Sequence, residues 1–239
     1  MRSIIQINNL TKKYKIDGRV FKALSNINLE IDKGSFTTIV GKSGCGKSTF
    51  LKIIAGLEKA TEGTISGETK IRSSLVFQEA RLMPWLTVEE NILFPLKNRD
   101  KKAKSQKKVD KHLHLLSLTE FKDAYPDQIS GGMAQRTALG RALVFDSDLI
   151  LMDEPLGSLD AFNRYKLQEE LKNIFSKNDK TVIFVTHDID EAIFLGDRVL
   201  IMDSGTIIEQ FNLKNDINIS KRKEKHLELK EKILVKLKT

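Results

Sequence analysis

The sequence predicts an α/β fold: a core of mainly parallel sheet, an N-terminal antiparallel β subdomain and an inserted helical subdomain. Three observations predict it. In the second half of the chain, short and wholly apolar segments alternate with helical patterns, which is typical of a parallel sheet covered on both faces. Up to residue 35, apolar and polar side chains alternate as they do in half-buried strands. Between residues 84 and 145 only helical spacing is found.

Composition limits the class of protein. The chain has 239 residues, of which 40% are hydrophobic and 30% charged, so it can bury a substantial core. No apolar run approaches the ~20 residues that cross a bilayer, and residues 1–15 lack the apolar centre of a secretory signal. We therefore expect a cytosolic protein, for which a role at a membrane would need a separate partner chain.

Two further features bear on partners. The single cysteine, Cys45, excludes an internal disulfide and a metal site built from cysteines alone. The net charge is +8, with lysine-rich stretches at 97–112 and from Lys221 onward. Because no aromatic residues interleave with these lysines, we expect solvated surfaces and no nucleic-acid partner.

The elements follow from local patterns. Strands are expected at 3–10, 21–31, 36–40, 75–78, 149–153, 181–187 and 198–203, and helices at 49–60, 88–98, 107–118, 131–145, 163–178 and 189–196. We expect one domain over residues 1–239. It comprises an α/β core at about 1–83 and 147–211, a helical subdomain at about 84–146 and a basic helical tail at about 212–239.

A glycine-rich loop between a buried strand and a helix predicts a phosphate site. The segment GKSGCGKST fits the P-loop pattern, in which glycines let backbone N–H groups surround phosphates. We expect Lys47 to reach the β- and γ-phosphates and Ser48 to hold Mg²⁺. The predicted nucleotide-binding residues of this loop are Gly41, Lys42, Ser43, Gly44, Cys45, Gly46, Lys47, Ser48 and Thr49.

Polar side chains at the ends of three apolar strands complete one face of this site. Asp153 follows LILM, where open α/β sheets bind ligands, and is expected to hold Mg²⁺. The next residue, Glu154, is expected to point elsewhere and to accept a proton from attacking water. Gln78 and His187 end the strands LVFQ and TVIFVTH. We therefore assign Lys47, Gln78, Glu154 and His187 to catalysis and Ser48, Gln78 and Asp153 to the metal.

A second anion-binding turn, Ser130-Gly131-Gly132, begins the helix predicted at 131–145. It lies in the helical subdomain and cannot easily fold back onto the same phosphate. A second copy of the chain offers another phosphate within its reach. We expect a head-to-tail homodimer that buries two ATP molecules and separates after hydrolysis.

Together, these motifs resemble the nucleotide-binding subunits of ABC transporters over residues 4–210. The resemblance implies a P-loop NTPase (RecA-like) core, ATP with Mg²⁺, ATP hydrolysis coupled to transport, and attachment to an integral membrane permease on the cytoplasmic side of the membrane. It also implies an adenine-stacking role for Tyr14, a D-loop at Ser158–Asp160, a Q-loop at Gln78, a signature motif at Ser130–Met133 and a switch histidine at His187.

Departures from the common signature point to a subclass. Ile129 and Met133 stand where the family's most frequent residues are leucine and glutamine. Together with RLMPWLTVEENI and a helix at 227–238, they resemble importers of nitrate, sulfonates and taurine, and relatives that carry thiamine precursors. Such an importer implies a separate solute-binding protein. Gly140, where relatives often have alanine, costs about 1 kcal/mol of helix stability without an evident reason in the sequence.

Some alternatives stay open at this stage. Met83, Trp85 and Leu86 form an apolar knob, which either docks a helix of a membrane partner or is buried in the helical lobe. A soluble ABC ATPase of cofactor assembly, an exporter and a non-catalytic regulatory module are rival functions. A DNA-repair ATPase is disfavoured, because roughly 50 residues separate Gln78 from the signature and leave no room for a long coiled coil.

Overall fold

The computed structural model describes residues 3–67, 71–96, 102–157, 159–176, 180–213 and 222–238. Ser158 of the predicted D-loop and parts of both lysine-rich stretches lie outside these ranges. The strands are β1 (Ser3–Ile16), β2 (Arg19–Asp32), β3 (Phe36–Val40), β4 (Glu62–Gly67), β5 (Ser73–Val76), β6 (Leu149–Asp153), β7 (Thr181–Thr186), β8 (Arg198–Asp203) and β9 (Thr206–Asn212). The helices are α1 (Lys47–Ile54), α2 (Val88–Leu93), α3 (Lys102–Leu115), α4 (Gly131–Val144), α5 (Ala161–Ser176), α6 (Ile189–Leu195) and α7 (Arg222–Lys238).

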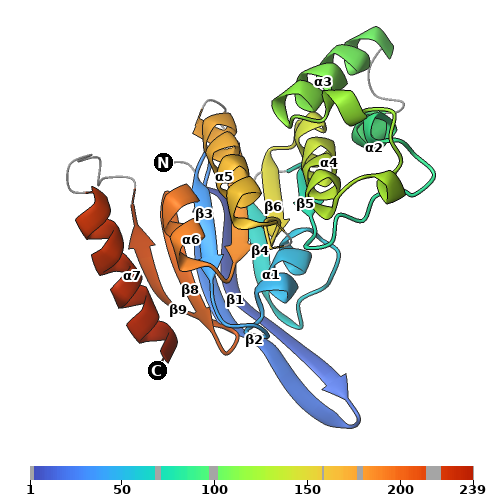
Figure 1. Cartoon of the computed structure of the whole chain (residues 1–239). Helices are drawn as coiled ribbons and strands as arrows, with labels where there is room; N and C mark the ends of the chain where they lie inside the picture. The colour runs from blue at the N-terminus through green and yellow to red at the C-terminus, as the bar shows by residue number, and fades with distance from the viewer. Residues whose placement is uncertain are drawn as a thin grey trace.

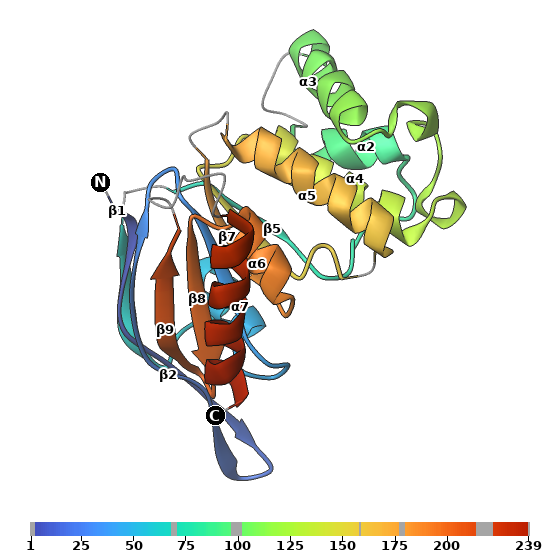
Figure 2. The ribbon, with the colours of Figure 1, turned by 60° about the vertical axis from the view of Figure 1, so that its left-hand side comes forward.

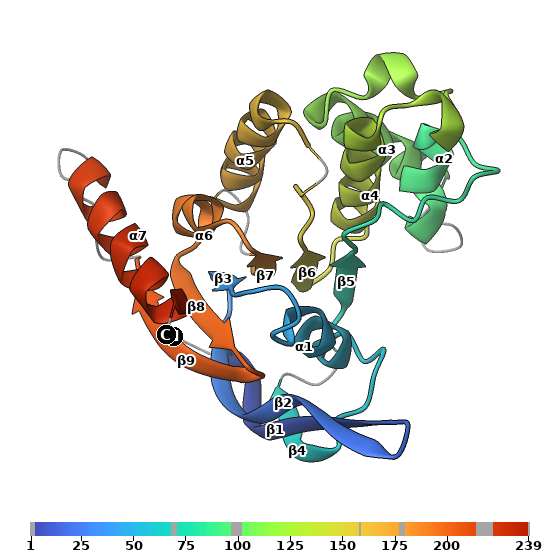
Figure 3. The ribbon, with the colours of Figure 1, turned by 60° about the horizontal axis from the view of Figure 1, so that its bottom comes forward.

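The central sheet has six strands in the order β5-β6-β7-β3-β8-β9. All neighbouring strands pair in parallel except β8 and β9, which are antiparallel. The predicted parallel sheet is thus confirmed, and β9 is an addition that the sequence did not reveal. Figure 3 looks along this sheet, with α1 and the N-terminal strands below it and α5, α6 and the helical subdomain above it.

The apolar runs of the central strands are explained by burial on both faces. On β7, Val182 and Phe184 pack into one core cluster, with α5 and the helical subdomain. The alternate residues, Ile183 and Val185, pack into the other, with α1 and the N-terminal strands. Successive side chains on a strand point to opposite faces, so only a continuous apolar run serves a sheet covered twice.

The N-terminal sheet is antiparallel, in the order β2-β1-β4. Figure 1 shows the β1–β2 hairpin projecting beyond the body of the molecule. Both strands are longer than predicted. β4 was not predicted, because every one of its residues is exposed and it presents no apolar pattern. Other expectations were also wrong in extent: α1 ends at Ile54, α2 ends at Leu93, α3 spans Lys102–Leu115, and β5 ends at Val76, two residues before Gln78.

In the described part of residues 84–145 the regular secondary structure is entirely helical, as predicted. The structure also explains Gly140, for which the sequence offered no reason. A Cβ atom at Gly140 would lie 3.0 Å from Cδ1 of Ile92 on α2 and 3.0 Å from Cδ1 of Leu116 beside α3. Glycine therefore lets α4 pack closely against its two neighbours.

Replacing Gly140 with valine is expected to destabilise the protein. Its branched side chain would overlap Ile92 and Leu116, and overpacking of this kind lowers the free energy of unfolding by about 2 kcal/mol. Urea denaturation would measure the change. Gly131→Val is the matched control on the same helix, because a Cβ atom there meets nothing within 4 Å. Equal stability of the two variants would contradict the packing explanation.

The basic C-terminal segment forms α7, which includes the helix predicted at 227–238. Ile233 is fully buried in a third cluster with residues of α6 and β8, and Figure 2 shows α7 lying along β8. Asp190, in the first turn of α6, accepts hydrogen bonds from His226 (2.9 Å) and Lys230 (2.5 Å). Among the described residues, no helix has both the length and the apolar character to span a bilayer.

Candidate nucleotide-binding and catalytic site

The glycine loop connects β3 to α1, as its motif predicts. Gly46 ends the loop with φ at 108°, in the left-handed region that favours glycine. A Cβ atom at Gly46 would lie 2.5 Å from the carbonyl oxygen of Ala23 on β2. At Gly41 it would lie 2.2 Å from the carbonyl oxygen of Met202 on β8. Both glycines are thus required by close backbone contacts, which fix the loop against its neighbours.

Lys47, the first residue of α1, is buried with its ammonium group inside the loop. Nζ donates hydrogen bonds to the carbonyl oxygens of Gly41 (2.7 Å) and Lys42 (3.0 Å). It also lies 3.8 Å from Oε1 of Glu154. A phosphate in the loop would offer this cation a charged partner in place of neutral carbonyls, which makes a stronger hydrogen bond.

Ser48 and Asp153 meet where α1 faces the end of β6. The Ser48 hydroxyl donates a 3.0 Å hydrogen bond to Oδ1 of Asp153. Burial raises the pKa of the Asp153 carboxyl, and the neighbouring Glu154 charge raises it further. A cation at these oxygens would compensate both effects. Among the described residues, no three His, Cys, Asp or Glu side chains form a metal cluster. An ion here would therefore need oxygens from a bound nucleotide or water as well.

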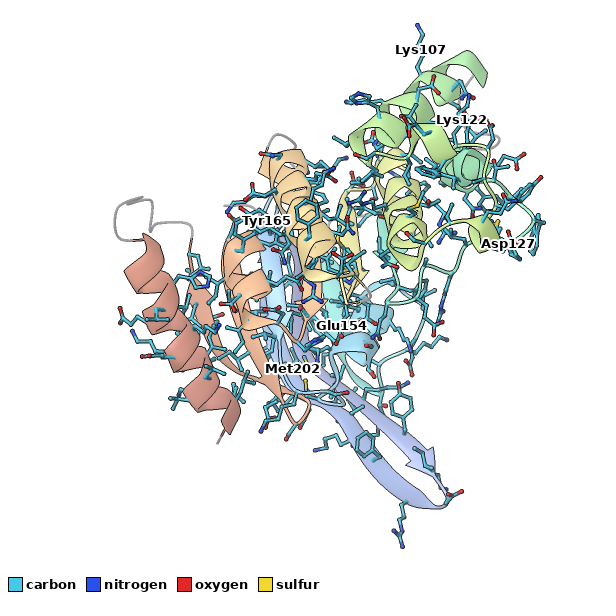
Figure 4. The ribbon with its side chains drawn as sticks, viewed as in Figure 1. Lys107, Lys122, Asp127, Glu154, Tyr165 and Met202 are labelled. Carbon is cyan, nitrogen blue, oxygen red and sulfur yellow. The ribbon has the colours of Figure 1, made fainter. Side chains whose placement is uncertain are left out.

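Glu154 contacts Lys47 and His187, whereas the neighbouring Asp153 accepts its hydrogen bond from Ser48. It adopts φ of 45°, a rare conformation for a side-chain-bearing residue, and its N–H bonds the carbonyl of Val185 on β7 at 2.9 Å. Its Oε2 lies 2.8 Å from Nδ1 of His187, which follows β7 directly. Figure 4 shows Glu154 near the centre of the molecule, far from Lys107 and Lys122 of the helical subdomain. The structure thus brings Lys47, Glu154 and His187 together.

Gln78 is exposed and follows β5. Side chains of α4 bond the backbone of this segment before and after Gln78. Gln135 donates to the carbonyl of Phe77 at 3.0 Å. Arg141 donates to the carbonyls of Ala80 and Arg81, both at 3.1 Å. In the described part of the chain, Gln78 makes no hydrogen bond to Ser48 or Asp153, so this structure does not bring it into their cluster.

The second turn caps α4. The Ser130 hydroxyl accepts a hydrogen bond from the N–H of Met133 at 3.3 Å. The front of the turn is open, since a Cβ atom at Gly131 would meet nothing within 4 Å. At Gly132 a Cβ atom would lie 2.8 Å from Cδ2 of Leu159, so the turn rests against the D-loop of its own chain. Asp160 of that loop accepts hydrogen bonds from Asn163 and caps α5.

Tyr14 lies on β1 beside α1. Its hydroxyl is hydrogen-bonded to Glu58 and to Thr49, and the Lys12 ammonium sits 4.9 Å from the ring centroid. Partial burial and the Glu58 carboxylate raise the pKa of this phenol. The ring is therefore held next to the helix that follows the phosphate loop, where a base attached to bound phosphates could reach it.

Some residues of the site escaped sequence reasoning. A small hollow beside Glu154 and His187 is also lined by Arg164 of α5 and by Thr186 and Glu191. None of these belongs to a motif. For Arg164 the available signal was spacing alone, since it stands one helical turn before Gln168 in the predicted helix 163–178.

Comparison with known proteins confirms the resemblance seen in the motifs. A family model described as "ABC transporter" matches residues 24–157. The "Aliphatic sulfonates import ATP-binding protein SsuB" of Bacillus cereus is 46% identical over 96% of this chain and 94% of its own. The "Bicarbonate transport ATP-binding protein CmpC" of Synechocystis is 40% identical over 86% of this chain, which spans 32% of that relative.

Solved structures agree with the sequence relatives. The ATP-binding cassette MJ0796, solved as a dimer in a post-hydrolysis state bound to ADP and Pi, superposes with a TM-score of 0.81 at 34% identity. The match covers 87% of this chain and 98% of that one. The chain therefore belongs to the ABC transporter family, and its fold is that of an ATP-binding cassette.

Proposed function

We propose that the chain couples ATP hydrolysis to the import of a small anion, such as a sulfonate, taurine or nitrate, through a separate permease. The 46% identity to a sulfonate-import subunit over nearly the whole chain carries the import assignment. Bicarbonate, which the name of the second relative gives, is also a small oxyanion and agrees with an anionic substrate. No comparison favours the rival function in cofactor assembly.

Within this function, each site residue has a role that its surroundings support. The loop Gly41–Thr49 binds the phosphates of ATP, with the buried Lys47 ammonium directed to the β- and γ-phosphates. Glu154 accepts the proton of the attacking water, and His187 orients the Glu154 carboxylate through their 2.8 Å hydrogen bond. Tyr14 stacks on the adenine.

Mg²⁺ fits the oxygen donors at the end of β6. Ser48 and Asp153 would hold it, because their oxygens lie 3.0 Å apart and the buried carboxylate gains from a neighbouring cation. Gln78 is proposed as a further oxygen ligand, brought in when its segment moves with α4. When bound, the ion neutralises charge on the transferring phosphate.

The open signature turn supports a homodimer with ATP at its interface. Ser130, Gly131 and Gly132 present a helix N-terminus to solvent and leave room in front of Gly131. In the dimer this turn contacts the γ-phosphate held by the second copy. ATP then joins the two chains, and its hydrolysis lets them separate.

An exposed apolar surface supports docking to a permease on the cytoplasmic side of the membrane. Trp85 is 71% exposed, so the alternative that it is buried in the helical lobe was wrong. The fully buried Asn91 fixes the segment that carries Trp85 by donating to the carbonyls of Met83 (3.2 Å) and Leu86 (3.0 Å). An aromatic side chain on a rigid segment is typical of an interface anchor.

The proposal is tested by purifying the tagged chain with its partners from detergent-solubilised membranes. We expect an integral permease and a solute-binding protein, identified by mass spectrometry. Trp85→Ala should lose the permease and keep ATP binding, whereas Leu227→Ala, which removes an apolar residue of α7 that is 61% exposed, should lose neither. Titrating sulfonates, nitrate and bicarbonate into the captured binding protein would name the substrate. Recovery of soluble partners alone would contradict an importer.

A further inference from the structure

Two side chains of α5 hold the segment that carries His187. The Arg164 guanidinium donates a 3.0 Å hydrogen bond to the carbonyl of Leu159, just before α5, and lies 3.6 Å from Oδ2 of Asp188. One turn later, Gln168 donates to Oε1 of Glu191 at 3.2 Å. Arg164 thus joins the D-loop to the residue next to His187, and Gln168 adds a second attachment to the same segment.

The residues before and after His187 in sequence are both held by hydrogen bonds. The N–H of Asp188 donates to the Thr186 hydroxyl at 3.0 Å, and the Asp188 carboxylate caps α6 through the N–H of Glu191 at 3.2 Å. Glu191 itself is only 4% exposed. The His187 side chain, by contrast, is 62% exposed and has Glu154 as its charged partner. The position of His187 therefore depends on its backbone, which these contacts set.

The other end of this chain of contacts is the signature turn. Gly132 packs so closely on Leu159 that a Cβ atom there would lie 2.8 Å from Cδ2 of Leu159. Arg164 grips the carbonyl of that same residue. A continuous set of contacts thus runs from Gly132 through Leu159 and Arg164 to His187 and its partner Glu154.

We propose that Arg164 is a positioning residue that transmits the state of the signature turn to the Glu154–His187 pair, with Gln168 supporting it. This inference rests on the roles proposed above for that pair and for the turn. When the turn engages ATP on a second copy, Leu159 moves with it, and Arg164 adjusts the segment that carries His187. Each chain then reports occupancy of the partner's ATP site to its own catalytic pair.

The test measures the rate and ATP dependence of hydrolysis by the purified full chain. Arg164→Met should lower kcat by roughly 10- to 100-fold, since a displacement near 1 Å of a catalytic group has effects of this size. It should bring the Hill coefficient for ATP close to one, with ATP affinity of the monomer unchanged. Arg164→Lys keeps the charge but donates from a single nitrogen atom, so it should recover part of the rate and cooperativity.

Lys172→Met is the matched control. Lys172 joins the same two helices, but at the far end of α6, where it donates to the carbonyl of Phe194 at 2.9 Å. We expect its kcat and Hill coefficient to match those of the unmodified chain. If Arg164→Met behaves like Lys172→Met, the proposal is wrong. Should Arg164→Met fail to fold, as judged by circular dichroism, Gln168→Met must show the same selective loss of kcat, and its absence would equally overturn the proposal.

A double mutant separates this inference from the proposed function. If Arg164 acts through His187, adding Arg164→Met to His187→Ala should lower kcat little further, because coupled residues are non-additive. If the fold-losses in kcat of the two single variants multiply in the double variant, Arg164 acts elsewhere. If His187→Ala alone keeps full turnover, the role proposed for His187 fails first, and the inference falls with it.

Discussion

Glu154→Gln is expected to abolish ATP turnover while leaving ATP binding intact. The amide keeps the size of the carboxylate and can still bond His187, but it cannot accept a proton from water. Loss of a general base typically costs 10²- to 10⁴-fold in rate. Phosphate release would measure turnover, and equilibrium binding of a fluorescent ATP analogue would measure affinity.

The same variant should also trap the dimer. Without hydrolysis, the ATP at both interfaces stays intact, so size-exclusion chromatography with ATP and Mg²⁺ should show a species of twice the monomer mass. Glu209→Gln is a suitable control, since this carboxylate on β9 pairs with Lys236, away from the loop. A Glu154→Gln enzyme with ordinary turnover would refute the assignment of Glu154 as the base.

The parallel core could be predicted because its strands are buried on two faces. Burial of this kind leaves runs such as LILM and TVIFV, which few other structures tolerate. β4 and β9 could not be predicted in this way. β4 is exposed along its whole length, and β9 has three exposed residues, so pairing with β1 and β8 decides their conformation rather than any local pattern.

Some residues of the candidate site could likewise be predicted from the sequence, and others could not. Gly41, Gly46 and Lys47 belong to one short motif between a buried strand and a helix, so the sequence alone could predict the loop. Arg141 and Arg164 hold carbonyl groups that are distant or unremarkable in sequence. Any residue supplies a carbonyl, so such contacts leave no motif and become visible only in the folded chain.

Ser130→Arg is expected to spare ATP binding by the monomer and to stop hydrolysis. The turn is open in front of Gly131, so a long cationic side chain can extend there without disturbing the loop Gly41–Thr49, which binds ATP within one chain. In a dimer, that side chain would occupy the space needed by the second copy's γ-phosphate. Turnover should fall to the background rate, and the ATP-dependent dimer should be lost in size-exclusion chromatography.

The substitution also removes a helix cap, and this effect must be separated from the blocked interface. The Ser130 hydroxyl bonds the N–H of Met133, and losing such a cap costs about 1 kcal/mol of stability. Ser130→Ala removes the cap without adding bulk, so it should share the stability loss of Ser130→Arg but still form the dimer. Ser130→Asn retains a capping oxygen and should stay close to the unmodified stability.

If Ser130→Arg hydrolyses ATP at the normal rate, the turn does not face the phosphate of a second copy, and the head-to-tail dimer must be abandoned. If Ser130→Ala is as inactive as Ser130→Arg, the hydroxyl itself contacts the phosphate, and the dimer stands with a more exact role for Ser130.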